Sequence, residues 1–228
     1  LAAFRAMRTP TYLGFATQAT NPDAMPFARE QFLRAFLKKT GRNVHPASIR
    51  LLTDASDDVI RDWPDTPPGL PPLLTTALAP GHNAFAGYRG AIRFRRPLYR
   101  EGTVFPELTL QFLTDPAIPD EVLRPMVEGR YILIGGNLED IDQFKTPLTR
   151  ATGETIAGLK VHAHMLAQLL DGMRWPGVPS RPLWIAAMLA VLGGVTTRLL
   201  ADRLWIVGPL LLAQAAATVL VPFWMQAK

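Results

Sequence analysis

Two histidines separated by one residue, His162 and His164, form the most chemically suggestive pair in this 228-residue chain. On a strand both imidazoles would lie on one face and could hold a metal together, whereas on a helix they diverge. Residues 158–170 repeat their apolar side chains at helical spacing and end at Asp171-Gly172, which predicts a helix. We therefore expect His162 to be a core histidine with a hydrogen-bonded ring, and His164 to point to solvent or a neighbouring loop.

A glycine pair, Gly135-Gly136, directly follows the apolar run 131–134. Exposed backbone N–H groups in such a turn can hold an anion. No G-x-G-x-x-G pattern follows, no lysine and serine complete a P-loop, and the next helix begins some way off. Nucleotide binding is therefore not the favoured interpretation.

Two clusters of charged residues also carry possible chemistry. Four aspartates lack the central glycine and terminal glutamate of a Ca²⁺ loop, so the first of them is predicted to cap a helix. Five arginines could bind an anionic ligand or lipid headgroups, or could form a solvated strand face. The aspartates are Asp54, Asp57, Asp58 and Asp62, and the arginines are Arg89, Arg93, Arg95, Arg96 and Arg100.

The composition removes several classes of function. There is no cysteine, which excludes disulfides, thiolate nucleophiles and sulfur-ligated zinc. No G-x-S-x-G motif is present, and the net charge of +5 is scattered instead of forming a basic face for nucleic acid. We predict no catalytic residue, no metal, no cofactor and no nucleic-acid partner.

The elements that would position these residues follow from hydrophobic periodicity. Residues 1–8 indicate the end of a helix, 12–16 a buried strand, and 63–80, with its many prolines, a loop. Ile92 and Phe94 alternate with arginines, which predicts a strand. Three further elements are a helical stripe in 105–113, a strand covered on both faces at 131–134, and the helix 158–170.

A helix is also predicted between Pro26 and Gly41, with apolar residues on one face and basic residues on the other. Two interpretations stay open: a helix packed on a sheet, or a basic helix lying on anionic lipid. The apolar positions are Phe32, Leu33, Phe36 and Leu37, and the basic positions are Arg29, Arg34, Lys38 and Lys39.

The C-terminal region changes character at Leu183. Residues 183–197 and 204–227 carry no charge, and about 20 apolar residues are needed to span a bilayer. Tryptophans flank both runs, as in an aromatic belt, and Gly193-Gly194 and Gly208 would let two helices approach closely. We predict a transmembrane hairpin over 183–228, with a buried soluble hairpin as the alternative. The charges do not settle its orientation.

Several motifs follow one another in order between Gly129 and Gly172. They are a strand ending in Ile134-Gly135, an aspartate at Asp142, the pair Thr146-Pro147, and a helix start Gly158-x-x-x-His162-Ala163. This order resembles the CHASE2 domain, the second type of cyclase/histidine-kinase-associated sensory extracellular domain. Looser likeness covers Leu1–Phe15, Arg93–Leu98 and Phe105–Leu113, so the resemblance spans most of residues 1–172.

The resemblance implies an extracytoplasmic sensor domain followed by membrane helices and a cytoplasmic output domain. The family usually has a glycine–aspartate pair where this chain has Tyr88-Arg89-Gly90, so we expect this member to sense something else or nothing small. Because the sequence opens at Leu1 and lacks the family's first membrane helix and strand, we expect a fragment or a processed product. The expected domains are a sensor over 1–175, a proline-rich joint over 176–182, and the hairpin.

The predicted fold is α/β, with a mixed sheet flanked by helices and followed by the transmembrane hairpin. The predicted function is the sensory input module of a membrane-bound receptor in the bacterial cytoplasmic membrane, with a cyclase or kinase as output. Its expected partners are the lipid bilayer, an unknown small-molecule or envelope signal, and a second copy of the chain. The alternatives are a membrane-anchored enzyme using Asp142, His162 and His164, and a ligand-free dimerisation scaffold. The candidate ligand-binding residues are Gly135, Gly136, Asp142, Thr146, Pro147, His162 and Arg93.

Overall fold

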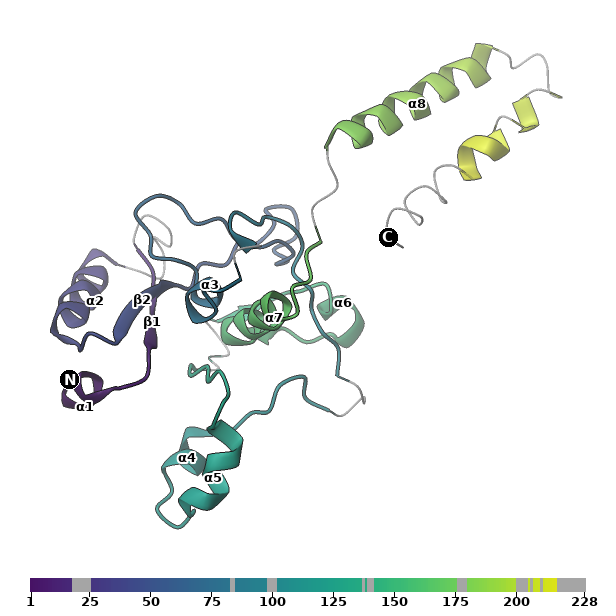
Figure 1. Cartoon of the computed structure of the whole chain (residues 1–228). Coiled ribbons are helices and arrows are strands. Elements are labelled where there is room, and N and C mark those ends of the chain that lie inside the picture. Colours follow the sequence, from purple (N-terminus) through teal and green to yellow (C-terminus); the bar gives the residue numbers. More distant parts are fainter. Residues whose placement is uncertain are drawn as a thin grey trace. The chain divides into compact units, whose positions relative to one another are not determined.

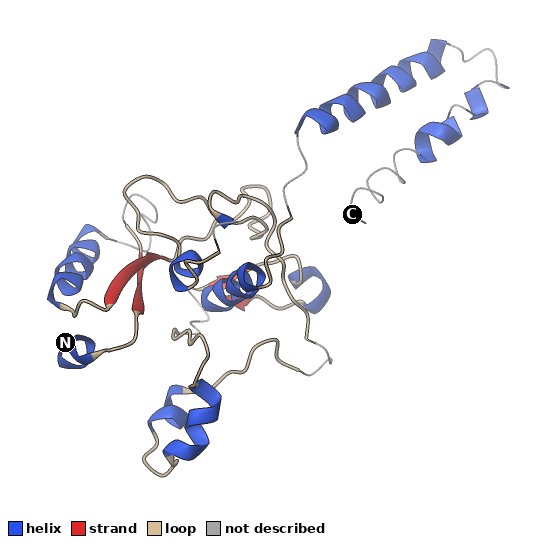
Figure 2. Cartoon of the chain, in the orientation of Figure 1, coloured by secondary structure: helices blue, strands red, loops and turns tan. Residues whose placement is uncertain are grey.

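The chain divides into two compact units, Leu1–Pro176 and Gly177–Lys228, which we call unit 1 and unit 2 and describe separately. Figure 1 shows the computed structural model along the sequence, and Figure 2 shows its helices and strands. The structure describes residues 1–17, 26–82, 85–97, 102–136, 138, 142–175, 180–199, 205, 207–209 and 211–216.

Unit 1 begins with a helix and a β–α–β arrangement. Helix α1 (Ala2–Ala6) leads into strand β1 (Thr11–Phe15), and helix α2 (Phe27–Lys39) precedes strand β2 (Val44–Ser48). The two strands pair in parallel from Thr11↔Val44 to Phe15↔Ser48, which requires a crossover such as α2. The helix predicted within 1–8, the strand predicted at 12–16 and the helix predicted after Pro26 are all present, although Phe15 is the one buried residue of β1.

The proline-rich segment is irregular except for one short helix. Helix α3 (Leu74–Leu78) forms where the prolines pause, between Pro72 and Pro80, and Leu74, Thr75 and Ala77 are buried in it. The prediction that 63–80 forms only a loop is wrong for these five residues, because proline restricts its own neighbourhood and not the whole stretch.

Two expected elements around the charged clusters do not form. Asp54 starts a turn instead of a helix, and its carboxylate accepts from the backbone and hydroxyl of Ser56. Ile92 and Phe94 do turn inward, but the extended segment that carries them belongs to no strand. The N–H groups of Arg93 and Arg95 bond instead to side chains of a helix, as described below, while the N–H of Ile92 donates to the carbonyl of Arg61 beside an isolated antiparallel bridge between Asp62 and Ala91. Alternation therefore predicted the inward-facing side chains correctly and a continuous strand wrongly.

Two short helices follow, α4 (Leu110–Thr114) and α5 (Asp120–Val127). Helix α4 begins at Thr109, whose hydroxyl accepts from the N–H of Phe112. Residues 105–109 are not helical, so the predicted helix in 105–113 forms only at its end.

The largest correction concerns residues 131–134, which were predicted to be a strand covered on both faces. No strand forms there, and Tyr131 and Ile134 are 50% and 77% exposed. Only Leu133 packs inward, against the small cluster that contains Ala47 and Leu74. An apolar run signals a tendency to be buried, but a strand also needs a neighbouring strand, and the described residues supply none here.

Unit 1 remains mixed α/β, but the single mixed sheet is wrong. Its described strands make two separate two-stranded sheets: β1 with β2, and β3 (Gln143–Phe144) antiparallel to β4 (Ile156–Ala157). Between β3 and β4 lies helix α6 (Thr149–Thr152), which ends at Gly153 with φ 76°. Helix α7 (Gly158–Leu170) then crosses the main core, where its Val161, Met165 and Leu169 are fully buried. The other buried members of that core are Ile60, Trp63, Leu73, Ala79, Phe85, Tyr88, Ile92 and Leu166.

Unit 2 contains helix α8 (Ser180–Leu199) and further helical residues between 205 and 216. Gly193 permits a close approach, since a Cβ there would lie 3.3 Å from Cδ of Gln214, whose amide donates to the carbonyl of Ala190. Among the described residues of the chain, no helix is both long enough and apolar enough to cross a membrane. The predicted hairpin of 183–228 is thus not confirmed, and most of its second half lies outside the described residues.

Candidate functional site

Helix α7 carries both histidines on separate sides. The ring of His162 is buried, and its Nε2 lies 3.3 Å from the carbonyl oxygen of Ile49, so the neutral ring can donate there. Burial lowers the pKa of His162 to about 4. Its Nδ1 is buried without a hydrogen-bond partner. These observations confirm a core histidine.

His164 faces the extended segment 91–95 and is not exposed to solvent. Its Nδ1 accepts from the backbone N–H of Arg95 at 3.1 Å, and its ring lies between the rings of Phe94 and Phe105, at 5.4 and 5.0 Å. Burial, and then the positive charges of Arg95 and Lys160, lower its pKa to about 4. The neighbouring-loop alternative is therefore correct and the solvent alternative wrong. No cluster of three or more metal-ligating side chains occurs within the described ranges.

The N-terminal end of α7 is packed against Asp142. The N–H of Gly158 donates to the backbone carbonyl of Asp142 at 3.1 Å, and a Cβ on Gly158 would lie 2.5 Å from the Asp142 carboxylate. Burial raises the pKa of Asp142, although the N–H of Gly158 partly offsets this effect. Gly135 approaches the same end, since a Cβ there would lie 3.2 Å from the Leu159 side chain. Gly136 is exposed beside Leu138.

The Thr146-Pro147 pair has a structural role. Thr146 is buried, its N–H donates to the Thr149 hydroxyl at 2.9 Å, and its own hydroxyl accepts from the N–H of Leu148. Pro147 is exposed at this turn. Together these contacts start α6, so the pair serves the fold without needing a ligand.

The C-terminal end of α7 is held by a buried amide, Gln168. Its Oε1 accepts from the N–H of Arg93 at 2.9 Å, and its Nε2 donates to the carbonyls of Ala91 and Met173, each at 3.0 Å. Only 1% of Gln168 is exposed. The Gln168 side chain therefore connects three segments: helix α7, the extended segment 91–95, and the residues that follow the helix.

Tyr88 ties down the same residues from the other side. Its hydroxyl accepts from the N–H of Trp175 at 2.8 Å and can donate to the carbonyl of Trp175 or of Ala91. Burial raises the pKa of Tyr88. The Trp175 carbonyl also accepts from the N–H of Ala91 and lies directly over Gly90, where any Cβ would overlap it.

Charged side chains surround this buried network. The carboxylate of Asp171 pairs with the guanidinium of Arg95 and lies 3.5 Å from that of Arg93. The Arg93 guanidinium also lies over the ring of Trp175, 5.9 Å from its centre. All three side chains of these ion pairs are about one-third exposed, so they add little to stability.

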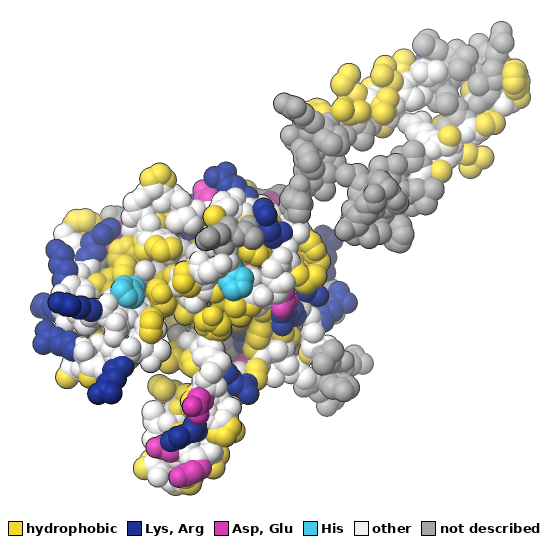
Figure 3. Space-filling view, in the orientation of Figure 1, with side chains coloured by type: hydrophobic (Ala, Val, Ile, Leu, Met, Phe, Trp, Pro, Cys, Tyr) yellow, Lys and Arg dark blue, Asp and Glu magenta, His cyan; other side chains and the backbone are white. Residues whose placement is uncertain are grey.

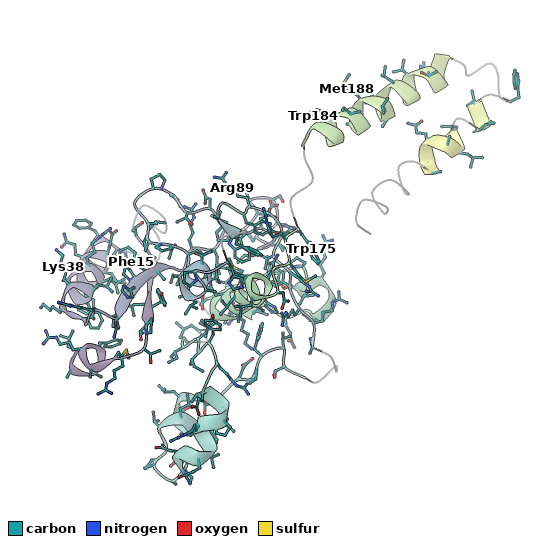
Figure 4. The ribbon with its side chains drawn as sticks, in the orientation of Figure 1. Phe15, Lys38, Arg89, Trp175, Trp184 and Met188 are labelled. Carbon is teal, nitrogen blue, oxygen red and sulfur yellow. The ribbon has the colours of Figure 1, made fainter. Side chains whose placement is uncertain are left out.

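We call these residues the exit clamp, because they fix the last described residues of unit 1 (Figure 4 labels Trp175). Of the predicted site residues, only Arg93 belongs to it. Gly135 and Asp142 lie at the opposite end of α7, about 18 Å away at the rise of an α-helix. Thus the seven candidate residues do not converge on one site. The exit clamp comprises Tyr88, Gly90, Ala91, Arg93, Arg95, Gln168, Asp171, Met173 and Trp175.

Sequence reasoning missed Tyr88, Gln168 and Trp175. One signal could have identified Gln168: it is a lone amide within the apolar run 165–170 of a helix predicted to be buried. Its contacts with the segment that begins at Tyr88 span 75 to 80 residues of sequence, which local patterns do not reveal.

Comparison with known proteins adds the family. No curated protein and no solved structure matches this chain. The CHASE2 domain matches residues 3–196, a range that covers the exit clamp and nearly all of α8. CHASE2 domains are sensory domains, not catalytic in themselves, and are typical of extracytoplasmic sensor modules in signalling proteins. The chain belongs to the CHASE2 domain family.

Proposed function

We propose that this chain is the sensory input module of a membrane-bound signalling receptor. In this proposal a ligand or an envelope condition stabilises one arrangement of unit 1, and the change passes through 171–181 towards a cytoplasmic cyclase or kinase. The observation that carries the proposal is the exit clamp. Gln168, in the last turn of α7, bonds to Met173 and contacts Tyr88, and Tyr88 bonds to Trp175, which gives a route from the helix to the last described residues of unit 1.

Membrane attachment through 183–228 is part of the proposal, with the bacterial cytoplasmic membrane as its location. Support comes from α8, whose sequence is largely apolar and whose described large apolar side chains are exposed. Trp184 and Met188 are 71% and 63% exposed (Figure 4). Such a helix is unfavourable in water unless lipid or another protein covers it.

The signal and the assembly are also proposals. We place the ligand near Gly135, Gly136 and Asp142, because Gly135 approaches Leu159 and Asp142 packs against Gly158, both in the first turn of α7, and Gly136 is exposed beside Gly135. We propose a homodimer as the signalling unit. The enzyme alternative receives no support, since Asp142, His162 and His164 lie in three different surroundings.

The test is to lengthen the joint in the intact receptor and to assay its own output domain. A Gly-Ser-Gly-Ser insertion within 176–182 should uncouple output from the signal, because flexible residues do not transmit movement. The matched control places the same insertion after Ala117, in an exposed turn between α4 and α5. Undiminished signalling with the joint insertion would contradict mechanical coupling.

A further inference from the structure

Positive charge gathers on one face of unit 1, over helices α1 and α2 (Figure 3). Residues 1–17 contain two arginines and residues 26–42 contain five lysines and arginines, against the single acid Glu30. Glu30 pairs with Arg34 within α2 at 2.7 Å and is the one acid in the described ranges 1–17 and 26–42, so this part of unit 1 carries an excess of positive charge. The basic residues of this face are Arg5, Arg8, Arg29, Arg34, Lys38, Lys39 and Arg42.

The two helices form one surface because they are joined by direct contacts. The Nε of Arg5 donates to the Lys39 carbonyl at 2.9 Å, and the rings of Phe4 and Phe36 meet edge to face at 5.4 Å. Asn43 ties down the chain after α1 by donating to the carbonyls of Met7 and Arg8. The charges of α1 are therefore held beside the C-terminal end of α2.

Large apolar side chains lie on the same surface. Phe27 is 60% exposed, and Phe32, which was predicted to share the apolar face of the helix with Leu33, Phe36 and Leu37, is 65% exposed. At 100° per residue, Phe27 and Lys38 lie on one edge of the outward face of α2, and Phe32 and Lys39 lie on the other. At the rise of an α-helix, the two members of these pairs are about 16 Å and about 10 Å apart along the axis. Between these edges lie small or short side chains, Ala28, Gln31 and Ala35, all exposed. The outward face is thus flat in its middle, with a phenylalanine and a lysine along each edge.

We propose that this face of α1 and α2 docks on an anionic lipid surface. Exposed phenylalanines on the same helix face as exposed lysines are the combination that an interfacial helix uses, since the rings enter the acyl boundary while the ammonium groups stay with the phosphates. Anionic lipid attracts each nearby basic residue. Lysines in the last turn of α2 also favour the helix itself, but that role does not require exposed aromatic rings. The inference does not depend on the signalling role.

The absence of cysteine makes a site-specific test possible. In the full chain, Ala35→Cys would carry an environment-sensitive fluorophore in the middle of the outward face, and Ala117→Cys would carry it on a distant exposed turn as the control. The probe is a phosphatidylcholine vesicle, with or without one third phosphatidylglycerol, that contains a doxyl-labelled quenching lipid. Because the readout is local, it reports on α2 whether or not 183–228 enters the bilayer.

We expect the label at position 35 to be quenched about twofold or more in vesicles with phosphatidylglycerol, and the label at 117 to be unaffected. Lys38→Glu with Lys39→Glu should abolish the quenching. Arg124→Glu with Arg130→Glu, which changes the net charge equally at exposed positions on and after α5, should leave it intact. Phe27→Ser with Phe32→Ser should also weaken it, with both lysines still present.

Three results would overturn the proposal. The first is no quenching at position 35 in either kind of vesicle. The second is equal loss with the α2 and α5 charge reversals, which would mean that overall charge alone acts. The third is a response at position 35 to heparin, a soluble polyanion, with none to phosphatidylglycerol, which would identify an acidic polymer as the partner.

Discussion

The two ends of helix α7 are held in different ways. At the N-terminal end, glycine at 158 lets the backbone lie against Asp142, with few side-chain hydrogen bonds. At the C-terminal end, the buried side chains of Gln168 and Tyr88 bond to the backbone of three segments. The C-terminal end is also closely packed, because Gly90 lies against the carbonyl of Trp175, so this end combines close backbone packing with a buried side-chain network. Under the proposed signalling role, this is the end through which the signal would leave unit 1.

Lowering the pH has the largest expected effect, because it should destabilise both ends of α7 together. The pKa values of His162 and His164 are lowered to about 4 in the folded chain, against about 6.5 when unfolded, so the unfolded chain binds more protons between these values. Stability is therefore lost as the pH falls from about 6.5 to about 4. We expect a loss of about 4 kcal/mol for the two histidines between about pH 7 and pH 5.

Denaturant unfolding across this pH range measures the effect. A His45→Gln variant, changed at an exposed histidine, should show the same pH dependence as the unmodified chain. A stability that stays flat down to about pH 5 would mean that both imidazoles can be protonated in the folded state.

Alanine at the two close-packed glycines compares the ends directly. At Gly90 the new Cβ would overlap the Trp175 carbonyl, which is backbone and cannot turn aside, so we expect a loss of about 3 kcal/mol or more. At Gly158 it would meet the Asp142 carboxylate and the Phe144 ring edge, which can move, so we expect about 1 kcal/mol. Thermal unfolding of both variants gives the order, and the reverse order would mean that the N-terminal end is the more rigid one.

Removing the buried amide tests the side-chain network itself. Gln168→Leu keeps the approximate volume but leaves the N–H of Arg93 and the carbonyl of Met173 without a partner, at a cost of about 2 kcal/mol. Hydrogen exchange should show Arg93 exchanging much faster. Gln111→Leu, at an exposed glutamine of α4, is the control and should change stability by less than about 0.5 kcal/mol. Equal effects of the two variants would remove the case for the exit clamp.

The sequence allowed the elements with a strong period to be predicted, and α2 and α7 are the clearest examples. The alternation at Ile92 and Phe94 correctly predicted that these side chains face inward, but it wrongly predicted a strand. Alternation indicates which side chains are buried, and it does not indicate which groups the backbone N–H groups bond to. The run 131–134 was wrongly predicted for a related reason: hydrophobicity cannot supply the missing neighbouring strand.

The candidate site was less predictable than the fold. The motif residues Thr146 and His162 have structural roles: Thr146 stabilises a turn, and His162 lies in the core. The exit clamp depends on Tyr88 and Trp175, which are 87 residues apart in the sequence. Such contacts are set by tertiary packing, so neither propensity nor spacing indicates them.

The smallest expected effects come from removing surface ion pairs, one of which lies at each end of α7. Lys160 lies 2.8 Å from Glu107 at the N-terminal end, and Asp171 serves both Arg93 and Arg95 at the other. All these side chains are partly exposed, so Asp171→Asn should cost less than about 1 kcal/mol, and Glu107→Gln less still because it serves one partner. Both costs should shrink in high salt. Urea unfolding at low and high salt would measure them. If Asp171→Asn instead cost as much as Gln168→Leu, the ions and not the buried amide would hold the exit from unit 1.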